Sequence, residues 1–448
     1  MIFQVSTPKD RHRSRARARI FADPPAVGQL ADLALWESEL ATDPAAAESE
    51  LVSRLRQVPD RRAKRGRRHA LVVILALTAC ATLVIGGDSI AAIWQWAARA
   101  PQAKLARIGA RYDPMTGRYL VPSERTFRRV LTNLEADALD TVTCEYTTDL
   151  ARGTVPAPEI PATPGPVERE QRRAARRSAE HPVPDGLLPA AALDGKALAG
   201  ARTESGRIFL VGAIDHASGA VLGQTQVPDK HGEGEAARML LTQLDLPGWV
   251  FTLDALHTTK KTAHLITGTL NSHYVLILKG NQPLTHAAAQ TLLTGTDTDF
   301  TETTAIDDDR GHGRTERRTL RTAPADHTLF PGASQVFRLR RDTGNLDGEW
   351  TSKEIVFGVT SLPPDLAGPA HLNHYERFHW TVENKIHWVR DVTFREDNSQ
   401  VRTGTAPRAL ASFRNLAIST IRLAGRVNIA HARRDLLRHE HAFAVYGI

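Results

Sequence analysis

Two aspartates stand inside apolar segments, where a negative charge is costly. Asp194 interrupts AALDGKAL at residues 191–198, and Asp254 lies near the end of WVFTLDA at residues 249–255. A carboxylate in an apolar strand has to be paired, hydrogen-bonded or metal-bound. Either residue taken alone is more often a helix cap or a loop acid. Together, on strands of one sheet, they indicate a site that binds cations.

A third carboxylate comes from the segment HYERFHWTVENKIHWVR at residues 374–390, which has helical periodicity. At about 100° per residue, His379, Glu383 and Arg390 fall within about 40° on one face. We therefore expect a polar ridge centred on Glu383, with an ordinary solvated helix face as the alternative. Glu316 is a rival third acid, although its period-two surroundings place it on a strand.

Three carboxylates gathered on one frame have a clear chemical use. Oxygen ligands suit Mg²⁺ or Mn²⁺. Two such ions activate the attacking oxygen and stabilise the leaving oxygen in an in-line phosphoryl transfer. We expect two ions held by Asp194, Asp254 and Glu383, with Arg390 neutralising phosphate charge.

Composition points to a polyanionic partner. The 448 residues include 57 Lys+Arg against 50 Asp+Glu, a formal charge of +7, which fits nucleic acid better than a membrane. Only two cysteines are present, which excludes a disulfide scaffold or a cysteine zinc site and favours the cytoplasm. The apolar run at residues 71–87 is shorter than the roughly 20 residues of a spanning helix, so we expect a buried helix and no membrane contact.

The chain divides into segments of different character. Residues 1–50 read as a basic, flexible extension, and residues 51–150 as an all-α domain, with DNA binding and plain helical packing as equal alternatives. Residues 151–190 hold many prolines around an arginine-rich run, which predicts a linker. Residues 191–430 read as the catalytic domain, and residues 431–448 as a C-terminal tail.

The catalytic domain begins with three strands at residues 191–198, 207–215 and 219–227. Helices and strands then alternate: helix 233–245, strand 249–255, helix 258–268, strand 273–279 and helix 283–293. A meander followed by crossovers predicts an α/β fold with a mixed sheet and helices on both faces, the ribonuclease-H-like order. Residues 296–368 read as a β-rich insertion, and helical periodicity returns at 371–391 and 406–424.

Several stretches, in this order and combination, carry a family resemblance. They include PSERTFRRVL, LDGKALAGAR, TLDALHT, YVLILKGNQP and HWTVENKIHWVRDVTFREDNSQVRTG. The chain resembles the DDE transposases of the ISAs type, the H-repeat-associated group within the IS-four superfamily. The resemblance covers residues from about 51 to 425. It implies that Asp194, Asp254 and Glu383 are the DDE acids, and that the β-rich stretch is the family's insertion before Glu383.

The sequence departs from the superfamily's helix signature, Tyr-x2-Arg-x3-Glu-x6-Lys. His379 holds the Arg position, Arg390 the Lys position and Glu376 the Tyr position. The resemblance implies DNA-end contacts for His379 and Arg390. The stretch KHGE at residues 230–233 has Gly232 where the family usually carries Asn.

Two further sets of residues are candidates for contact with DNA phosphates. Lys279 and Asn281 follow the strand at 273–279, where a strand-end turn is the alternative. The second set lies in the basic run RRAKRGRRH at residues 61–69, where a solvated loop is the alternative, and consists of Arg61, Arg62, Lys64 and Arg65. His257 follows Asp254 by three residues and reads as a supporting residue or a helix N-terminal residue.

The resemblance implies a transposase that binds the terminal inverted repeats of its own insertion sequence, cleaves there and joins the ends to target DNA. The resemblance implies a homodimer or larger assembly on nucleoid DNA. Two alternatives remain open: a catalytically inactive or domesticated DNA-binding protein, and a ribonuclease-H-like nuclease without strand transfer.

Overall fold

The computed structural model describes residues 48–448 except 204–205, 228–231, 297, 312 and 381. The residues from Glu48 to Ile448 form one compact unit. Nearly all of the extension expected at 1–50, together with Lys230 and His231 of the KHGE stretch, lies outside the described residues.

Short helices make up the first part of this unit. They are α2 (Glu50–Leu55), α3 (Leu71–Ile85), α4 (Ile90–Ala97), α5 (Gln102–Arg107), α6 (Glu124–Thr132) and α7 (Ala136–Arg152), with a small hairpin of β1 (Arg111–Asp113) and β2 (Arg118–Leu120). Helix α3 is buried all round, as its continuous apolar sequence predicts, and ends at Gly86 in the left-handed conformation. Among the described helices, none alone is long and apolar enough to cross a membrane. Helices α3 and α4 reach that length and hydropathy only when they are counted together, and the chain bends by 104° between them.

The hydrophobic core of these helices is shared with the C-terminal part of the chain. It also contains residues of α13 (Ala406–Leu423), α14 (Ile429–Asp435) and α15 (His439–Ala444). Helix α13 is buried along nearly its whole length. Residues 431–448, expected as a tail, are thus largely helical and packed against α3, because Phe443, Val445 and Tyr446 are buried there.

A nine-stranded sheet organises the rest of the unit, in the order β5-β4-β3-β6-β7-β11-β10-β9-β8. Its first five strands in the chain are β3 (Ala190–Thr203), β4 (Gly206–Asp215), β5 (Val221–Val227), β6 (Val250–Leu253) and β7 (His273–Leu278). The neighbours β5, β4 and β3 are antiparallel, whereas β3, β6 and β7 run parallel. The expected α/β fold with a mixed sheet is confirmed.

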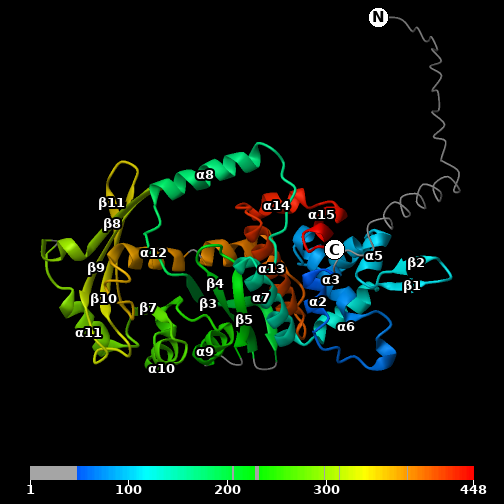
Figure 1. Ribbon diagram of the computed structural model, residues 1–448, viewed down its shortest axis with the longest axis horizontal. Helices are drawn as coiled ribbons and strands as arrows, with labels where there is room; N and C mark the ends of the chain where they lie inside the picture. The colour runs from blue at the N-terminus through cyan, green and yellow to red at the C-terminus, as the bar shows by residue number, and fades with distance from the viewer. Residues whose placement is uncertain (1–47, 204–205, 228–231, 297, 312, 381) are drawn as a thin grey trace, which may run out of the picture. The chain divides into compact units, whose positions relative to one another are not determined.

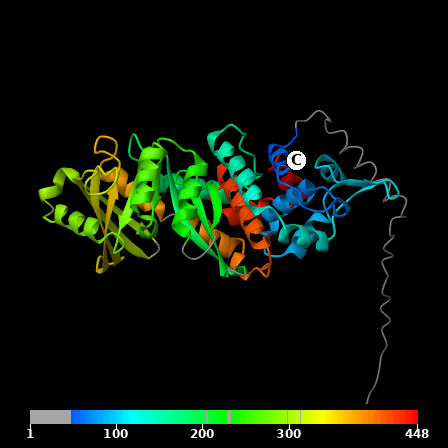
Figure 2. The same cartoon turned by 90° about the horizontal axis from the view of Figure 1, so that it is seen from below.

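Helices cover both faces of this sheet, because its strands alternate side chains between two cores. On one face, Ala191 and Leu193 of β3 pack in a cluster with α9 (Glu233–Leu244), α10 (Lys260–His264) and α11 (Pro283–Leu292). On the other face lie α7, α12 (Pro369–His379) and α13. Figures 1 and 2 show the strands between these two layers, with α2 to α6 beyond the β5 edge.

The β-rich stretch consists of β8 (Thr304–Gly311), β9 (Arg314–Pro324), β10 (Gln335–Asn345) and β11 (Trp350–Thr360), preceded by the turn η4 (Thr298–Thr303). These antiparallel strands continue the central sheet, since β11 pairs with β7. The proline-rich segment before β3 contains α8 (Pro166–Glu180), which has no buried residue and lies apart from the sheet in Figure 1.

One glycine fixes the connection that leads into α13. Gly404 has a φ of +57°, and a Cβ there would lie 2.2 Å from the carbonyl oxygen of Thr132 on α6. We expect Gly404→Ala to lower the free energy of unfolding by about 3 kcal/mol, because the left-handed conformation and a backbone clash both oppose it. Urea unfolding measures the change.

Gly425→Ala is the matched control for Gly404→Ala. Gly425 has a φ of +77° and no atom within 4 Å of the added Cβ, so only the conformational cost of about 1 kcal/mol remains. If Gly404→Ala and Gly425→Ala lowered the free energy of unfolding equally, the contact with Thr132 would not be the cause of the larger effect expected at Gly404.

Candidate active site

Asp194 lies in β3, between β4 and β6. Its Oδ1 accepts a hydrogen bond of 2.8 Å from the backbone N–H of Gly195. Burial, together with the nearby negative charges of Asp254 and Glu383, raises the pKa of Asp194 to about 6 against the opposing effect of that hydrogen bond. The carboxylates predicted from the sequence are therefore close enough to influence one another.

Asp254 follows β6 and is held by the turn that comes after it. Its Oδ1 accepts from the N–H groups of Leu256, at 3.0 Å, and His257, at 3.3 Å, and so caps the turn η2 (Ala255–His257). Because Leu193 of β3 pairs with Leu253 of the parallel strand β6, the residues that follow them, Asp194 and Asp254, come at equivalent positions along the two chains. Strand register, rather than sequence distance, places these two acids together.

Glu383 comes from the helix that covers this edge of the sheet. It is the first residue of a π-helical turn, η5 (Glu383–His387), which is followed by a second, η6 (Val389–Thr393). Its side chain is 66% exposed, and its Oε2 lies 3.1 Å from Nδ1 of His387, which lies 3.5 Å from Oδ2 of Asp194. One potential ligand atom from each of these three residues falls within 4.8 Å of the others.

His387 and Glu233 are not among the site residues predicted from the sequence. His387 follows Glu383 by four residues, and a π turn, with its i→i+5 bonds, brings residues four apart nearly into line. Glu233 begins α9, and a Cβ on residue 195 would lie 2.2 Å from its Oε1. Gly195 therefore leaves the space that lets Glu233 reach the edge of the site.

His257 links Glu233 to Asp254. Its Nε2 lies 3.6 Å from Oε1 of Glu233 and 4.0 Å from Oδ1 of Asp254, and its side chain is buried. His257 therefore lies beside Asp254 and is also the last residue of the turn η2.

His379 lies beside Asp254 and is partly buried. Its Nδ1 is 3.0 Å from Oγ1 of Thr252. Burial lowers the pKa of His379 to about 4, despite the opposing charge of Asp254. The imidazole is therefore neutral at pH 7 and supplies no positive charge for a phosphate.

The predicted common face of Glu383 and Arg390 is wrong. Arg390 is 3% exposed, and its guanidinium binds Glu396 at 2.7 Å. The reason is the helix register: an α-helix turns about 100° per residue, and the π turns between Glu383 and Arg390 rotate Arg390 away from Glu383. Arg390 therefore faces the interior instead of DNA.

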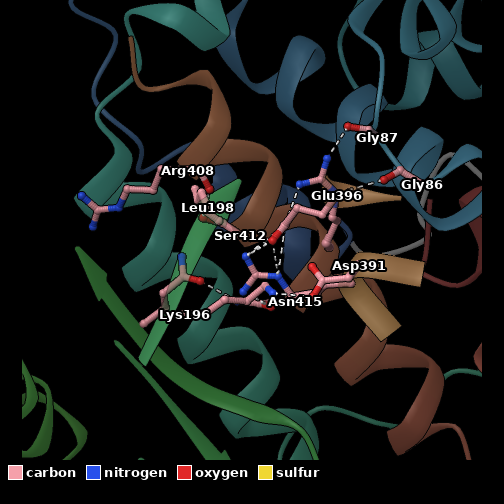
Figure 3. A network of polar contacts seen from close by, with 12 residues as sticks. Gly86, Gly87, Lys196, Leu198, Asp391, Glu396, Arg408, Ser412 and Asn415 are labelled. Carbon is pink, nitrogen blue, oxygen red and sulfur yellow. Dashed lines mark hydrogen bonds and ion pairs between the residues drawn. The ribbon is translucent and has the colours of Figure 1, made fainter. Parts of the chain in front are cut away.

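Glu396 is the centre of a buried polar network that contains Arg390. Arg414 of α13 binds Glu396 at 2.7 Å and donates to the carbonyl oxygens of Gly86 and Gly87, at the end of α3. Figure 3 shows these contacts and also Lys196 and Asp391, whose charged groups lie 2.7 Å apart. The network joins the helix that carries Glu383 to α3 and α13, and Lys196 joins it to β3.

Lys279 and Asn281, predicted to contact DNA phosphates, differ in their surroundings. Lys279 is exposed after β7. Asn281 instead donates to the carbonyl oxygens of Ala255, at 2.6 Å, and Thr258, at 3.0 Å. Its amide thereby braces the loop after Asp254.

The basic run contains the turn η1 (Lys64–Gly66). Arg61 is paired with Glu135 at 2.6 Å, and Arg62 binds Asp60 at 2.8 Å, whereas Lys64 and Arg65 are exposed.

The rival acid Glu316 lies on β9 as expected, beside Arg318 at 3.6 Å and Arg314 at 3.7 Å. It is not in the cluster of Asp194, Glu383 and His387.

Comparison with known proteins identifies the family. A family model described as transposase DDE domain matches residues 190–419, more than half of the chain. A second, described as DDE_Tnp_1-associated, matches residues 52–147. The chain belongs to the DDE transposase family, which confirms the resemblance found in the sequence.

Individual relatives agree with this assignment. The protein named "Putative transposase YncI" of Escherichia coli O157:H7 is 25% identical over 380 residues, 82% of this chain and 85% of that protein. The "H repeat-associated putative transposase YhhI" of Escherichia coli K12 is 25% identical over 245 residues, 51% of this chain and 63% of its own length. A solved piggyBac transposase synaptic complex with hairpin DNA matches 81% of this chain and 79% of its own, with 10% identity and a TM-score of 0.35.

The donor groups of the site fit a divalent cation. Two carboxylates and an imidazole present their ligand atoms within 4.8 Å of one another, and these are ordinary ligands of such ions. The family assignment and this cluster together support the use of a divalent metal.

Proposed function

We propose that this protein cleaves DNA at the ends of its own insertion sequence and joins those ends to target DNA. The observation that carries the proposal is the convergence of Asp194 and Glu383 at the point where the strand register also brings Asp254. The strand order, a three-stranded meander extended by two parallel strands, supports a ribonuclease-H-like frame for these acids.

Asp194, Asp254 and Glu383 would hold Mg²⁺ or Mn²⁺, with two ions expected. When bound, such ions supply Lewis-acid activation of the attacking and leaving oxygens. The protein's own residues hold the acids in place: the N–H groups of Leu256 and His257 orient Asp254, and that of Gly195 orients Asp194. Asn281 braces the loop after Asp254 from the neighbouring strand end.

Residues 51–150 are proposed to recognise the terminal inverted repeats, with the protein acting as a homodimer or larger assembly on nucleoid DNA in the cytoplasm. The exposed Lys64 and Arg65 support a contact to the DNA backbone. Lys279, exposed after β7, is proposed to contact phosphate near the acids.

The double variant Lys64→Gln, Arg65→Gln tests the proposed backbone contact. We expect weaker binding to flank DNA, with the slope of log K against log[salt] reduced by about 2, because each phosphate contact releases about one counterion. Fluorescence anisotropy over a salt series measures this. Lys353→Gln, on the exposed part of β11, is the control, and an equal change there would contradict a specific role for η1.

The function itself is tested with a plasmid that carries the gene's own flanking DNA. The purified protein is incubated with it in Mg²⁺, in Mn²⁺ and in EDTA, and the products are sequenced. Metal-dependent cuts at the flank boundaries together with joined ends support the proposal. Cuts without joined ends would indicate a nuclease, and specific binding without cuts an inactive DNA-binding protein.

A further inference from the structure

His387 is placed as a donor to the same ion site as the acids. Its Nδ1 faces two carboxylates at once, Glu383 at 3.1 Å and Asp194 at 3.5 Å. The side chain is 9% exposed, so the ring has little freedom to turn away. The ligand atoms of Asp194, Glu383 and His387 lie within 4.8 Å of one another. A cation bound by the two carboxylates would therefore also be within reach of the imidazole nitrogen.

The backbone explains why the imidazole has this position. Glu383 and His387 are the first and last residues of the π turn η5, and they come from the same face of it. Asp194 approaches from β3 across the sheet edge. Two separate elements thus aim three donor atoms at one point, and the single π turn supplies two of them. Such turns are frequently found at functional sites.

We propose that His387 is a metal ligand of the active site, binding through Nδ1 beside Asp194 and Glu383. This inference rests on the proposed function, because it concerns the ion that the acids would hold. The proposed function needs only carboxylate ligands, whereas this inference adds one nitrogen ligand to them.

A nitrogen ligand changes which ion the site prefers. Carboxylate and water ligands suit Mg²⁺, whereas imidazole binds transition metals more readily, with affinities that rise along the first row from Mn²⁺. The site should therefore bind Mn²⁺ more tightly than Mg²⁺. Removal of the imidazole should raise the Kd for Mn²⁺ by at least about tenfold and change that for Mg²⁺ much less.

Pulsed electron paramagnetic resonance of Mn²⁺ bound to the full chain tests the proposal without any measure of activity. We expect a ¹⁴N coupling typical of a bound imidazole, which is replaced by a ¹⁵N coupling when the protein is made with ¹⁵N-histidine. This isotope substitution needs no mutation. Asp194→Asn establishes that the Mn²⁺ observed is the ion of this site, because its binding should weaken in that variant.

Three asparagine variants then assign the coupling to one ring: His387→Asn, His257→Asn and His379→Asn. We expect the coupling to be lost in His387→Asn and kept in the other two. Should His387→Asn fail to fold by circular dichroism, retention of the coupling in both other variants excludes those two rings and leaves His387, whose Nδ1 lies within 3.5 Å of both acids. Loss of the coupling in His257→Asn or His379→Asn alone would assign the ligand elsewhere and overturn the proposal.

The outcomes separate this inference from the function on which it rests. Mn²⁺ binding that depends on Asp194 but shows no histidine coupling overturns the role of His387 and leaves the carboxylate site intact. Mn²⁺ binding that is absent, or unaffected by Asp194→Asn, overturns the metal site itself and the His387 inference with it.

Discussion

Glu383→Ala is expected to reduce the rate of metal-dependent cleavage of the flank DNA by at least about a thousandfold. Loss of a carboxylate that holds the catalytic ions removes several kcal/mol of transition-state stabilisation, and each 1.4 kcal/mol is a factor of about ten in rate. Glu383 is 66% exposed, so the fold should tolerate the change. Quantified cleavage of a labelled flank fragment in Mg²⁺, with circular dichroism as a check on folding, measures the effect.

Glu316→Ala provides the comparison for this loss. Glu316 is also an acid of the same domain, but it lies on β9 beside Arg314 and Arg318. We expect its replacement to leave the cleavage rate within about threefold of the unaltered protein, because a residue away from the reacting atoms loses no transition-state contact. The opposite pattern, with cleavage lost in Glu316→Ala and kept in Glu383→Ala, would move the third acid to the insertion.

Glu396→Gln is expected to lower the free energy of unfolding by about 3–5 kcal/mol. Glu396 is 4% exposed and is the common partner of Arg390 and Arg414, which are themselves buried. Removing one partner of a buried ion pair leaves an uncompensated buried charge, and here two guanidinium groups lose their carboxylate. Chemical unfolding followed by tryptophan fluorescence measures the difference.

The same carboxylate makes stability depend on pH. Burial would raise the pKa of Glu396, but the charges of Arg390 and Arg414 outweigh burial and lower it to about 2, below the ordinary value of 4.5. A carboxylate with a lowered pKa in the folded state stabilises the protein above the unfolded pKa, and this is lost as the pH falls. We expect the stability difference between the unaltered protein and Glu396→Gln to shrink between about pH 4.5 and pH 2.

Glu354→Gln is the surface counterpart. Glu354 pairs with Arg341 on the insertion, where both side chains are substantially exposed, and such pairs contribute less than about 1 kcal/mol. If Glu396→Gln proved as mild as Glu354→Gln, the network in Figure 3 would not be holding the helix of Glu383 in place.

Much of this protein could be predicted from the sequence. Asp194 and Asp254 interrupt apolar strands, and a charge in such a position needs a cation or a hydrogen-bond partner, so the two stood out without any structure. Strand and helix periodicity likewise indicated the mixed sheet, the β-rich stretch before Glu383 and the buried helix α3. These features are local, or follow from the alternation of apolar residues along each element.

Tertiary structure decided the remainder of the site. The helical wheel assumed α-helical turns throughout, whereas η5 and η6 are π turns, so Arg390 turns away from Glu383 and binds Glu396. Glu233 reaches the edge of the site because α9 contacts β4 and β5 and Gly195 has no side chain in the way. Residues 431–448 belong to the same core as α3. The positions of Glu233 and of residues 431–448 depend on contacts between segments far apart in the chain, and a periodic pattern within one segment carries no information about them.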